Sequence, residues 1–325
     1  MHQPLYRQAI THSWKLIWQH KLLWPFGLFA AFLGQMGLVD FLSRVSISSS
    51  TLRTSPLWYS LPTFFADSSA MGSIQLPLDG WMWLFWLVMV LVGFGAMFVF
   101  VSVVSQGAII HAVGQSIKKK KLHVDTAWDA GVSHFWRLFF LNLLKKILFW
   151  ILAGVIGWAT LEIVMAPTAT DIFAFIILFV LVSFIGLFLS FFTIYAAGYI
   201  VIEEYRFFEA LRAAWKLCMG HWLVSLEIGL ILVFLQIVFG LVTAASFLLF
   251  LLPTLLLASV GAATGVGGII VFAVFVGLTL FILFVIFVAS LFTLFSTSLW
   301  SYLFMKMHKE GVVSRLLHWL KWQRA

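Results

Sequence analysis

The sequence carries very little charge for its length. Of its 325 residues, 10% are charged and 63% are hydrophobic, whereas a soluble domain has about 25% charged and about 45–50% apolar residues. So few charged side chains could not cover the apolar core of a water-soluble fold of this size. The composition therefore excludes an ordinary soluble domain and predicts a protein whose outer surface is solvated by lipid.

Cysteine and catalytic motifs are also scarce. Cys218 is the only cysteine, so no intramolecular disulfide can form. The sequence has no nucleophile elbow, no phosphate-binding glycine loop and no His-Glu-x-x-His motif. We therefore predict no catalytic residue, no cofactor and no metal site. No clear cleavage site follows the first apolar run, so we expect the N-terminal segment to be retained.

Long apolar runs are what the sequence has in abundance. A helix that crosses a bilayer needs about 20 mostly apolar residues. Six runs meet this requirement, near residues 22–40, 81–108, 141–165, 172–202, 223–251 and 268–305. They predict an all-α integral membrane protein with about six transmembrane helices. We expect residues 252–268, which begin with Leu-Pro and are rich in Gly and Ala, to form the outer turn between the last two helices; a short re-entrant segment is the alternative.

Basic residues are nearly absent from one side of such a bundle. With six spans, residues 41–80, 166–171 and 252–267 lie on the same side, and of the 20 Lys and Arg that side has only Arg44 and Arg53. Cytoplasmic segments carry the excess of Lys and Arg in membrane proteins. We therefore predict a multi-pass protein with both termini on the cytoplasmic side.

The same asymmetry explains the formal net charge of +8. The charge follows from the membrane topology and does not indicate a nucleic-acid partner. The run Lys118 to Lys121 is instead expected to attract anionic lipid headgroups, at about 1 kcal/mol per basic residue near the surface. The predicted partners are therefore membrane lipids, with anionic headgroups at the cytoplasmic face.

A short motif occurs three times, each time ahead of a span that leaves the cytoplasm. A small residue precedes a tryptophan, and a histidine follows six places after that tryptophan. The three copies contain Ser13, Trp14 and His20; Ala127, Trp128 and His134; and Ala214, Trp215 and His221. The apolar residues around each tryptophan share one helical face, which is typical of an amphipathic helix at the membrane interface.

The motif predicts an internal repeat of an interfacial helix, an outward span and an inward span. Within a single membrane domain, 1–325, repeat 1 covers 4–117, repeat 2 covers 118–203 and repeat 3 covers 204–308. The basic and aromatic residues of 309–325 are expected to form a further interfacial segment. We expect the six repeated tryptophans and histidines to be interfacial anchors. The equal spacing of the histidines follows from the repeat and is not taken as a metal site.

The residues around the motif resemble a known bacterial group. Residues 210–217 read Ala-Leu-Arg-Ala-Ala-Trp-Lys-Leu, residues 220–222 read Gly-His-Trp, and residues 9–16 read Ala-Ile-Thr-His-Ser-Trp-Lys-Leu. These segments are similar to an element of the membrane domain attached to some glycerophosphoryl diester phosphodiesterases. The resemblance implies a membrane domain in a bacterial cytoplasmic (inner) membrane. It does not imply phosphodiesterase activity, because the catalytic barrel of those proteins has no counterpart here.

Three ionisable residues are candidates for a position inside the membrane. If the third span keeps the register of the first, Lys145 and Lys146 lie within the bilayer and require partners or a water-filled cavity. Alternatively, the preceding interfacial helix runs longer, the span covers Ile147 to Met165 and the lysines reach the interface. Glu227, near the start of the fifth span, is expected to pair with a basic residue of an interfacial helix; a transport or binding role is the alternative.

The sequence leaves three functions open. The first is a non-enzymatic membrane protein that binds lipid or a membrane partner through its interfacial helices and grooves. The second is a transporter or channel for a small or lipidic substrate, which internal repeats favour but the lack of an evident row of buried polar residues does not. The third is a membrane enzyme acting on lipid.

Overall fold

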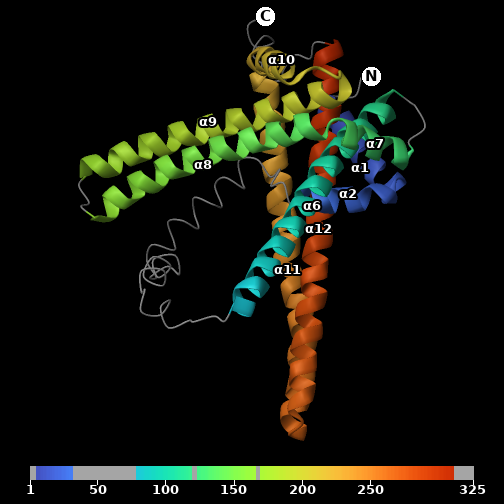
Figure 1. Cartoon of the computed structure of the whole chain (residues 1–325), viewed down its shortest axis with the longest axis vertical. Helices are drawn as coiled ribbons and strands as arrows, with labels where there is room; N and C mark the ends of the chain where they lie inside the picture. The colour runs from blue at the N-terminus through green and yellow to red at the C-terminus, as the bar shows by residue number, and fades with distance from the viewer. Residues whose placement is uncertain (1–4, 32–77, 119–122, 166–168, 311–325) are drawn as a thin grey trace, which may run out of the picture. The chain divides into compact units, whose positions relative to one another are not determined.

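The computed structural model describes residues 5–31, 78–118, 123–165 and 169–310 (Figure 1). Nearly all of these residues are helical and none of them is in a strand, so the predicted all-α class is confirmed. Most of the predicted outer segment 41–80, Lys119 to Lys121 of the basic run, and residues 311–325 of the predicted C-terminal segment lie outside the described residues.

Five described helices are long and apolar enough to cross a membrane. They are α6 (Leu78–Ile117), α8 (Phe135–Met165), α9 (Ala169–Ile202), α11 (Trp222–Thr264) and α12 (Gly267–Glu310). The predicted first span is described only as far as Ala31, through the short helices η1 (Lys21–Leu23) and α2 (Trp24–Ala31). These lengths support a multi-pass membrane protein.

Three shorter helices contain the repeated tryptophans. They are α1 (Leu5–Gln19), α7 (Val124–Ser133) and α10 (Phe207–Gly220). In α10 the buried residues Ala210, Ala214, Leu217 and Cys218 recur at the three- and four-residue spacing of one helical face. The opposite face of α10 carries the exposed Arg212 and Lys216.

The chain divides into two compact units. The first comprises Met1–Gln35, Ser102–Phe139 and Phe192–Ala325, and the second comprises Met36–Val101 and Phe140–Phe191. Most of the buried residues belong to the first unit. In the second unit, Ile156 of α8 and Val182 of α9 are buried among aromatic and leucine side chains of the same two helices. These two helices form a hairpin (Figure 1).

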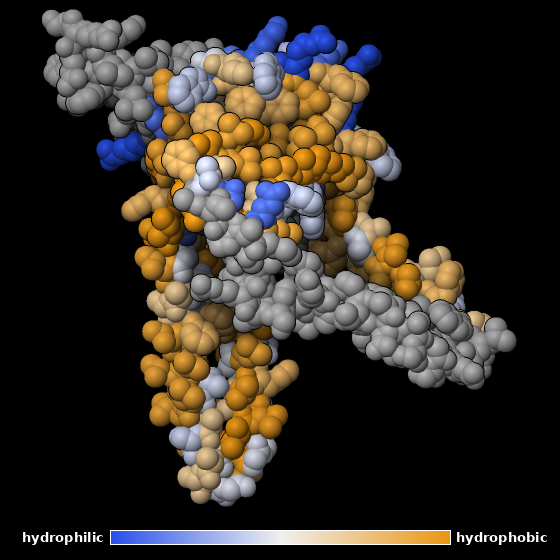
Figure 2. Space-filling model, turned by 90° about the vertical axis from the view of Figure 1, so that its left-hand side faces the viewer, coloured by the Kyte–Doolittle hydropathy of each residue, from blue (hydrophilic) through white to orange (hydrophobic). Residues whose placement is uncertain are grey.

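The last two helices, α11 and α12, lie side by side along most of their length (Figure 1). The rings of Phe239 and Phe292 are 5.2 Å apart, and those of Phe247 and Phe281 are 5.3 Å apart. A Cβ added to Gly277 would overlap the side chain of Thr254, so Thr254 packs into the space that a side chain at residue 277 would fill. Hydrophobic side chains cover the exposed surface of the hairpin, which Figure 2 shows from one side.

The turn between the last two helices is much shorter than the predicted turn over residues 252–268. Residues 252–264 continue α11, with Pro253 inside the helix. The chain reverses at Gly265, whose φ of 70° glycine adopts without steric cost. Proline is tolerated in spanning helices, and the apolar residues after it let the helix continue. Within these described residues there is therefore neither an extended outer turn nor a re-entrant segment.

Candidate functional site

Each repeated histidine lies at a junction between two helices and has a non-helical backbone. The junctions are Gln19-His20-Lys21, Ser133-His134-Phe135 and Gly220-His221-Trp222. At the third, the N–H of His221 donates to Leu217 O (3.0 Å), and the carbonyl of His221 accepts from the N–H of Ser225 (3.1 Å). The histidine backbone thus ends one helix and begins the next, so these histidines mark the bends between the amphipathic and the following helices.

Each repeated tryptophan packs against a phenylalanine of another helix. The ring pairs are Trp14 with Phe295 of α12 (6.3 Å, 72°), Trp215 with Phe192 of α9 (6.2 Å, 76°) and Trp128 with Phe26 of α2 (5.9 Å, 23°). The first and third pairs are edge-to-face with nearly equal distance and angle, while the second is stacked. Both arrangements are favourable for aromatic rings.

The first and third copies of the motif also match in exposure. Trp14 and Trp215 are each 49% exposed. The small residue before each tryptophan is fully buried, and the lysine after it, Lys15 or Lys216, is exposed. We call the exposed pairs Trp14-Lys15 and Trp215-Lys216 the Trp-Lys corners. Each corner presents an indole and an ammonium group on the outer side of an amphipathic helix.

The second copy differs in both packing and charge. Trp128 is partly buried, and the residue after it is the exposed Asp129, where the other copies have lysine. Gly131 of α7 lies so close to α6 that an added Cβ would be 2.3 Å from the backbone oxygen of Val104. The helix α7 therefore packs tightly and presents a carboxylate instead of an ammonium group.

An aromatic cluster extends the first Trp-Lys corner. The rings of Trp14 and Trp18 are 5.8 Å apart, those of Trp18 and Trp24 are 5.7 Å apart, and those of Trp24 and Phe287 are 5.3 Å apart. Trp24 Nε1 donates to Ile17 O at 3.1 Å. Trp18 and Trp24 were not predicted from the repeated motif, although the four-residue spacing from Trp14 to Trp18 places these two residues on one side of α1.

The candidate intramembrane residues occupy separate places. The helix α8 runs without a break through Lys145 and Lys146, so no helix ends just before Ile147. The chain bends earlier, at His134, because α7 ends there. Lys145 is partly buried, with Nζ 5.9 Å from the centre of the Phe149 ring, and Lys146 is exposed.

Glu227 is partly buried in α11. It belongs to the first compact unit, whereas Lys145 and Lys146 belong to the second. Neither cavity described below is lined by any of the three.

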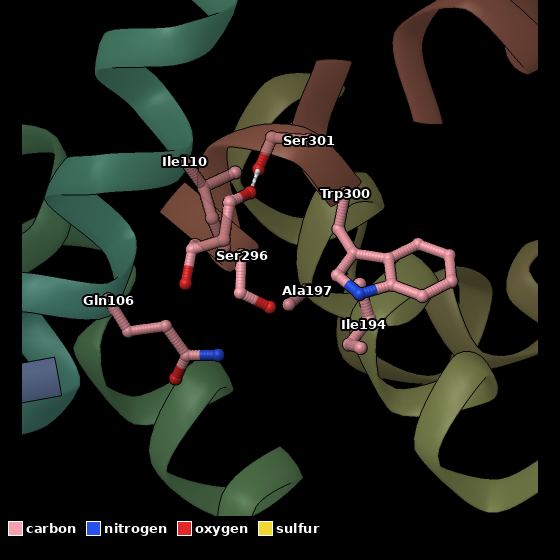
Figure 3. A pocket seen from close by; sticks show the side chains of 8 residues that line it. Gln106, Ile110, Ile194, Ala197, Ser296, Trp300 and Ser301 are labelled. Carbon is pink, nitrogen blue, oxygen red and sulfur yellow. Dashed lines mark hydrogen bonds between the residues drawn. The ribbon is translucent and has the colours of Figure 1, made fainter. Parts of the chain in front are cut away.

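A small polar cavity lies between α6, α9 and α12. It is lined by Gln106, Ile110, Ile194, Ala197, Ser296, Thr297, Trp300 and Ser301. Figure 3 shows the amide of Gln106 and the hydroxyl of Ser296 directed into this space, with Ile194 and Ala197 on the side of α9. Its volume of about 20 Å³ is enough for one water molecule, which requires about 10–15 Å³.

A second, shallow cavity is entirely apolar. Ala9 and Ile10 of α1, Ile228 and Ile231 of α11, and Leu299 and Leu303 of α12 line it. It marks the contact of α1 with the last hairpin and offers no polar group to a ligand.

A row of buried polar residues that is not evident in the sequence lies on α12. Ser290, Thr293, Thr297 and Ser301 of α12 are all buried and recur every three or four residues, so they share one face. Ser290 Oγ donates to Trp24 O (2.7 Å) and Ser301 Oγ donates to Thr297 O (2.8 Å). Single hydroxyl groups within a long apolar run do not lower its hydropathy enough to be noticed.

Two titratable groups of the amphipathic helices are shifted by burial. The imidazole of His12 lies 3.3 Å from Ser116 Oγ and packs on the ring of Tyr302, and desolvation lowers the pKa of His12. Burial raises the pKa of the Cys218 thiol to about 11. At neutral pH both groups are therefore held in their uncharged forms.

Five apolar helices of spanning length place this chain among the multi-pass helical membrane proteins. Comparison with protein-family models, with curated proteins and with solved structures finds no match to this chain. The resemblance to the membrane domain of some glycerophosphoryl diester phosphodiesterases thus stays a prediction from the residues quoted above.

Proposed function

We propose that the chain is a non-enzymatic membrane protein that binds lipid or a membrane partner through its amphipathic helices. The two Trp-Lys corners carry this proposal. Their apolar neighbours are buried against longer helices, while the indole and the ammonium group stay exposed. Tryptophan and lysine in this combination are typical of surfaces that meet lipid headgroups.

We infer that the three motifs belong to three hairpin repeats with six spans, and that both termini are cytoplasmic. The contacts of the amphipathic helices support this layout. The helix α1 packs on α12, α7 on α6 and α10 on α9. Each therefore contacts the returning helix of the preceding repeat, and the first repeat contacts the last.

Reporter fusions test this layout. We expect fusions after residues 60 and 168 to be active only outside the cytoplasm, and fusions after residues 120 and 210 only inside, as the distribution of Lys and Arg predicts. A fusion after residue 60 that reports the cytoplasm contradicts the six-span arrangement.

Retained native lipid tests the function. The protein is extracted gently, and the lipids that remain bound are identified by mass spectrometry. We expect bound phospholipid in the wild type and less of it in the Trp14→Ala, Trp215→Ala double variant, because each substitution removes an exposed indole. The matched control is Trp136→Ala, which removes an indole that is 66% exposed outside the Trp-Lys corners. Equal retention in all three proteins contradicts the proposal.

The polar cavity between α6, α9 and α12 favours a second function, the passage of a small uncharged solute. The cavity has room for about one water molecule. A path for a solute through this cavity is therefore closed in the structure. Replacing Gln106 and Thr297 by Ala widens it. If this function is correct, liposomes containing the double variant become more permeable to glycerol than wild-type liposomes, which stopped-flow light scattering measures.

A further inference from the structure

We propose that α1 and α10 each bind the phosphate group of one anionic phospholipid and that α7 does not. The protein would then have two similar lipid sites although its motif occurs three times. This inference rests on the proposed lipid-binding function and specifies its sites and its ligand. It follows from comparing the same positions in the three amphipathic helices.

The two sites have the same geometry. In both, the indole meets a phenyl ring edge-on, at 6.3 Å and 72° for Trp14 and at 6.2 Å and 76° for Trp215. From the small residue before the tryptophan to the histidine, the two segments 13–20 and 214–221 also have the same order of buried, partly buried and exposed residues. A ligand that contacts the indole and the ammonium group of one corner therefore finds the same two groups at the other.

The charges at the corners suit a phosphate group. The ammonium groups of Lys15 and Lys216 are exposed directly beside the half-exposed indoles, so a phosphate can accept from the lysine while the acyl chain lies on the aromatic rings. In α10 the exposed Arg212 precedes Lys216 by four residues, and the two side chains lie on the same helical face. In α1 the corresponding residue is Thr11, so we expect the α10 site to bind more tightly.

The charges of α7 are reversed at both corresponding positions. Asp129 occupies the position of Lys15 and Lys216, and Asp125 occupies the position of Arg212; both aspartates are exposed. Two carboxylates beside a phosphate repel it. Trp128 is also partly buried in its stack on Phe26, so less of its ring is left for an acyl chain.

Native mass spectrometry with a defined lipid tests the inference. The full-length protein is delipidated in detergent and titrated with phosphatidylglycerol, and phosphatidylcholine serves as the uncharged comparison. We expect two tightly bound phosphatidylglycerol molecules in the wild type, one in Lys15→Gln, one in Lys216→Gln and none in the double variant. Arg212→Gln should weaken one site by about fivefold.

The control is Asp129→Gln, which alters the corresponding exposed position of α7 and should leave two bound molecules. Lys216→Arg keeps the positive charge and should also retain two, which separates loss of charge from a change in folding. Unchanged retention in both Lys→Gln variants, or an equal loss in Asp129→Gln, overturns the two-site inference while lipid binding stands. A wild type that retains neither lipid overturns both the inference and the proposed function.

Discussion

The two halves of α6 differ in composition and in surroundings although they form one helix. The N-terminal half, up to Val101, carries large apolar side chains, and nearly all of those described are exposed. The C-terminal half, from Ser102, is mostly buried and contains Ser105 and Gln106. In a membrane protein the most apolar surface faces lipid, whereas small and polar residues make the contacts between helices. The less apolar half is therefore the one that packs.

Matched glycine substitutions in the two halves should give the largest difference. In the C-terminal half, a Cβ on Gly107 would be 3.0 Å from the Cα of Gly131 and 2.9 Å from Cδ1 of Leu138. We expect Gly107→Leu to destabilise the protein by at least about 1–3 kcal/mol through overpacking. In the N-terminal half, a Cβ on Gly95 would have no neighbouring atom within 4 Å. We therefore expect Gly95→Leu to be neutral or slightly stabilising. Thermal unfolding in detergent measures both, and equal effects would remove the contrast between the halves.

The buried hydrogen bond between Tyr195 and Ser225 should give the next largest effect. Their hydroxyl oxygens are 2.5 Å apart and join α9 to α11. Ser225→Ala leaves the Tyr195 hydroxyl without this partner and should cost about 1–3 kcal/mol. The exposed Thr279 bonds only to Phe275 O of its own helix, so Thr279→Ala should cost less than about 0.5 kcal/mol. A double-mutant cycle with Tyr195→Phe sharpens the result, because additive effects would mean that the hydrogen bond contributes nothing.

The reactivity of Cys218 distinguishes buried from water-exposed positions without changing stability. Burial and a pKa of about 11 leave very little thiolate at pH 8. We expect slow reaction with a membrane-permeant maleimide in the folded protein and fast reaction in denaturing detergent. In the Cys218→Ser background, Thr126→Cys places a thiol on the exposed side of α7, outside the spanning helices, and should react faster. Rapid labelling of native Cys218 would show that α10 does not stay packed.

The smallest expected effect is a dependence of stability on pH through His12. Its pKa is lowered by burial, so the unfolded chain binds the proton more strongly than the folded one. The free energy of unfolding should therefore be at its full value above pH about 6.5 and should fall as the pH decreases from there towards the folded-state pKa. The unfolding temperature at pH 5 should be lower than at pH 7.5, and His12→Gln should reduce this difference. If the difference in unfolding temperature is the same in His12→Gln as in the wild type, the pH dependence comes from groups other than His12.

The membrane class and the three motifs could be predicted because they depend on local information. Apolar runs of sufficient length and a tryptophan six places before a histidine can be counted directly. The structure places each described motif at a helix junction. That Trp14 and Trp215 contact Phe295 and Phe192 could not be predicted, because these partners come from distant parts of the chain.

Two departures from the sequence pattern have one physical origin. Pro253 was expected to lie in an outer turn, and one of the two alternatives for Lys145 and Lys146 placed them at the end of an interfacial helix. In the structure α11 and α8 continue through these residues. Helix propagation is cooperative, so a long apolar helix tolerates a single unfavourable residue. Local preference at one position was therefore outweighed by the residues on both sides of it.

The hairpin of α11 and α12 has a consequence for how the protein enters its membrane. Between Glu227 and Lys306 the chain contains no Asp, Glu, Lys, Arg or His, including the reversal at Gly265. An insertion machinery that moves this segment into lipid therefore never has to dehydrate a formal charge. The two helices can enter together as a preformed pair, because neither has a charged side chain between these two residues.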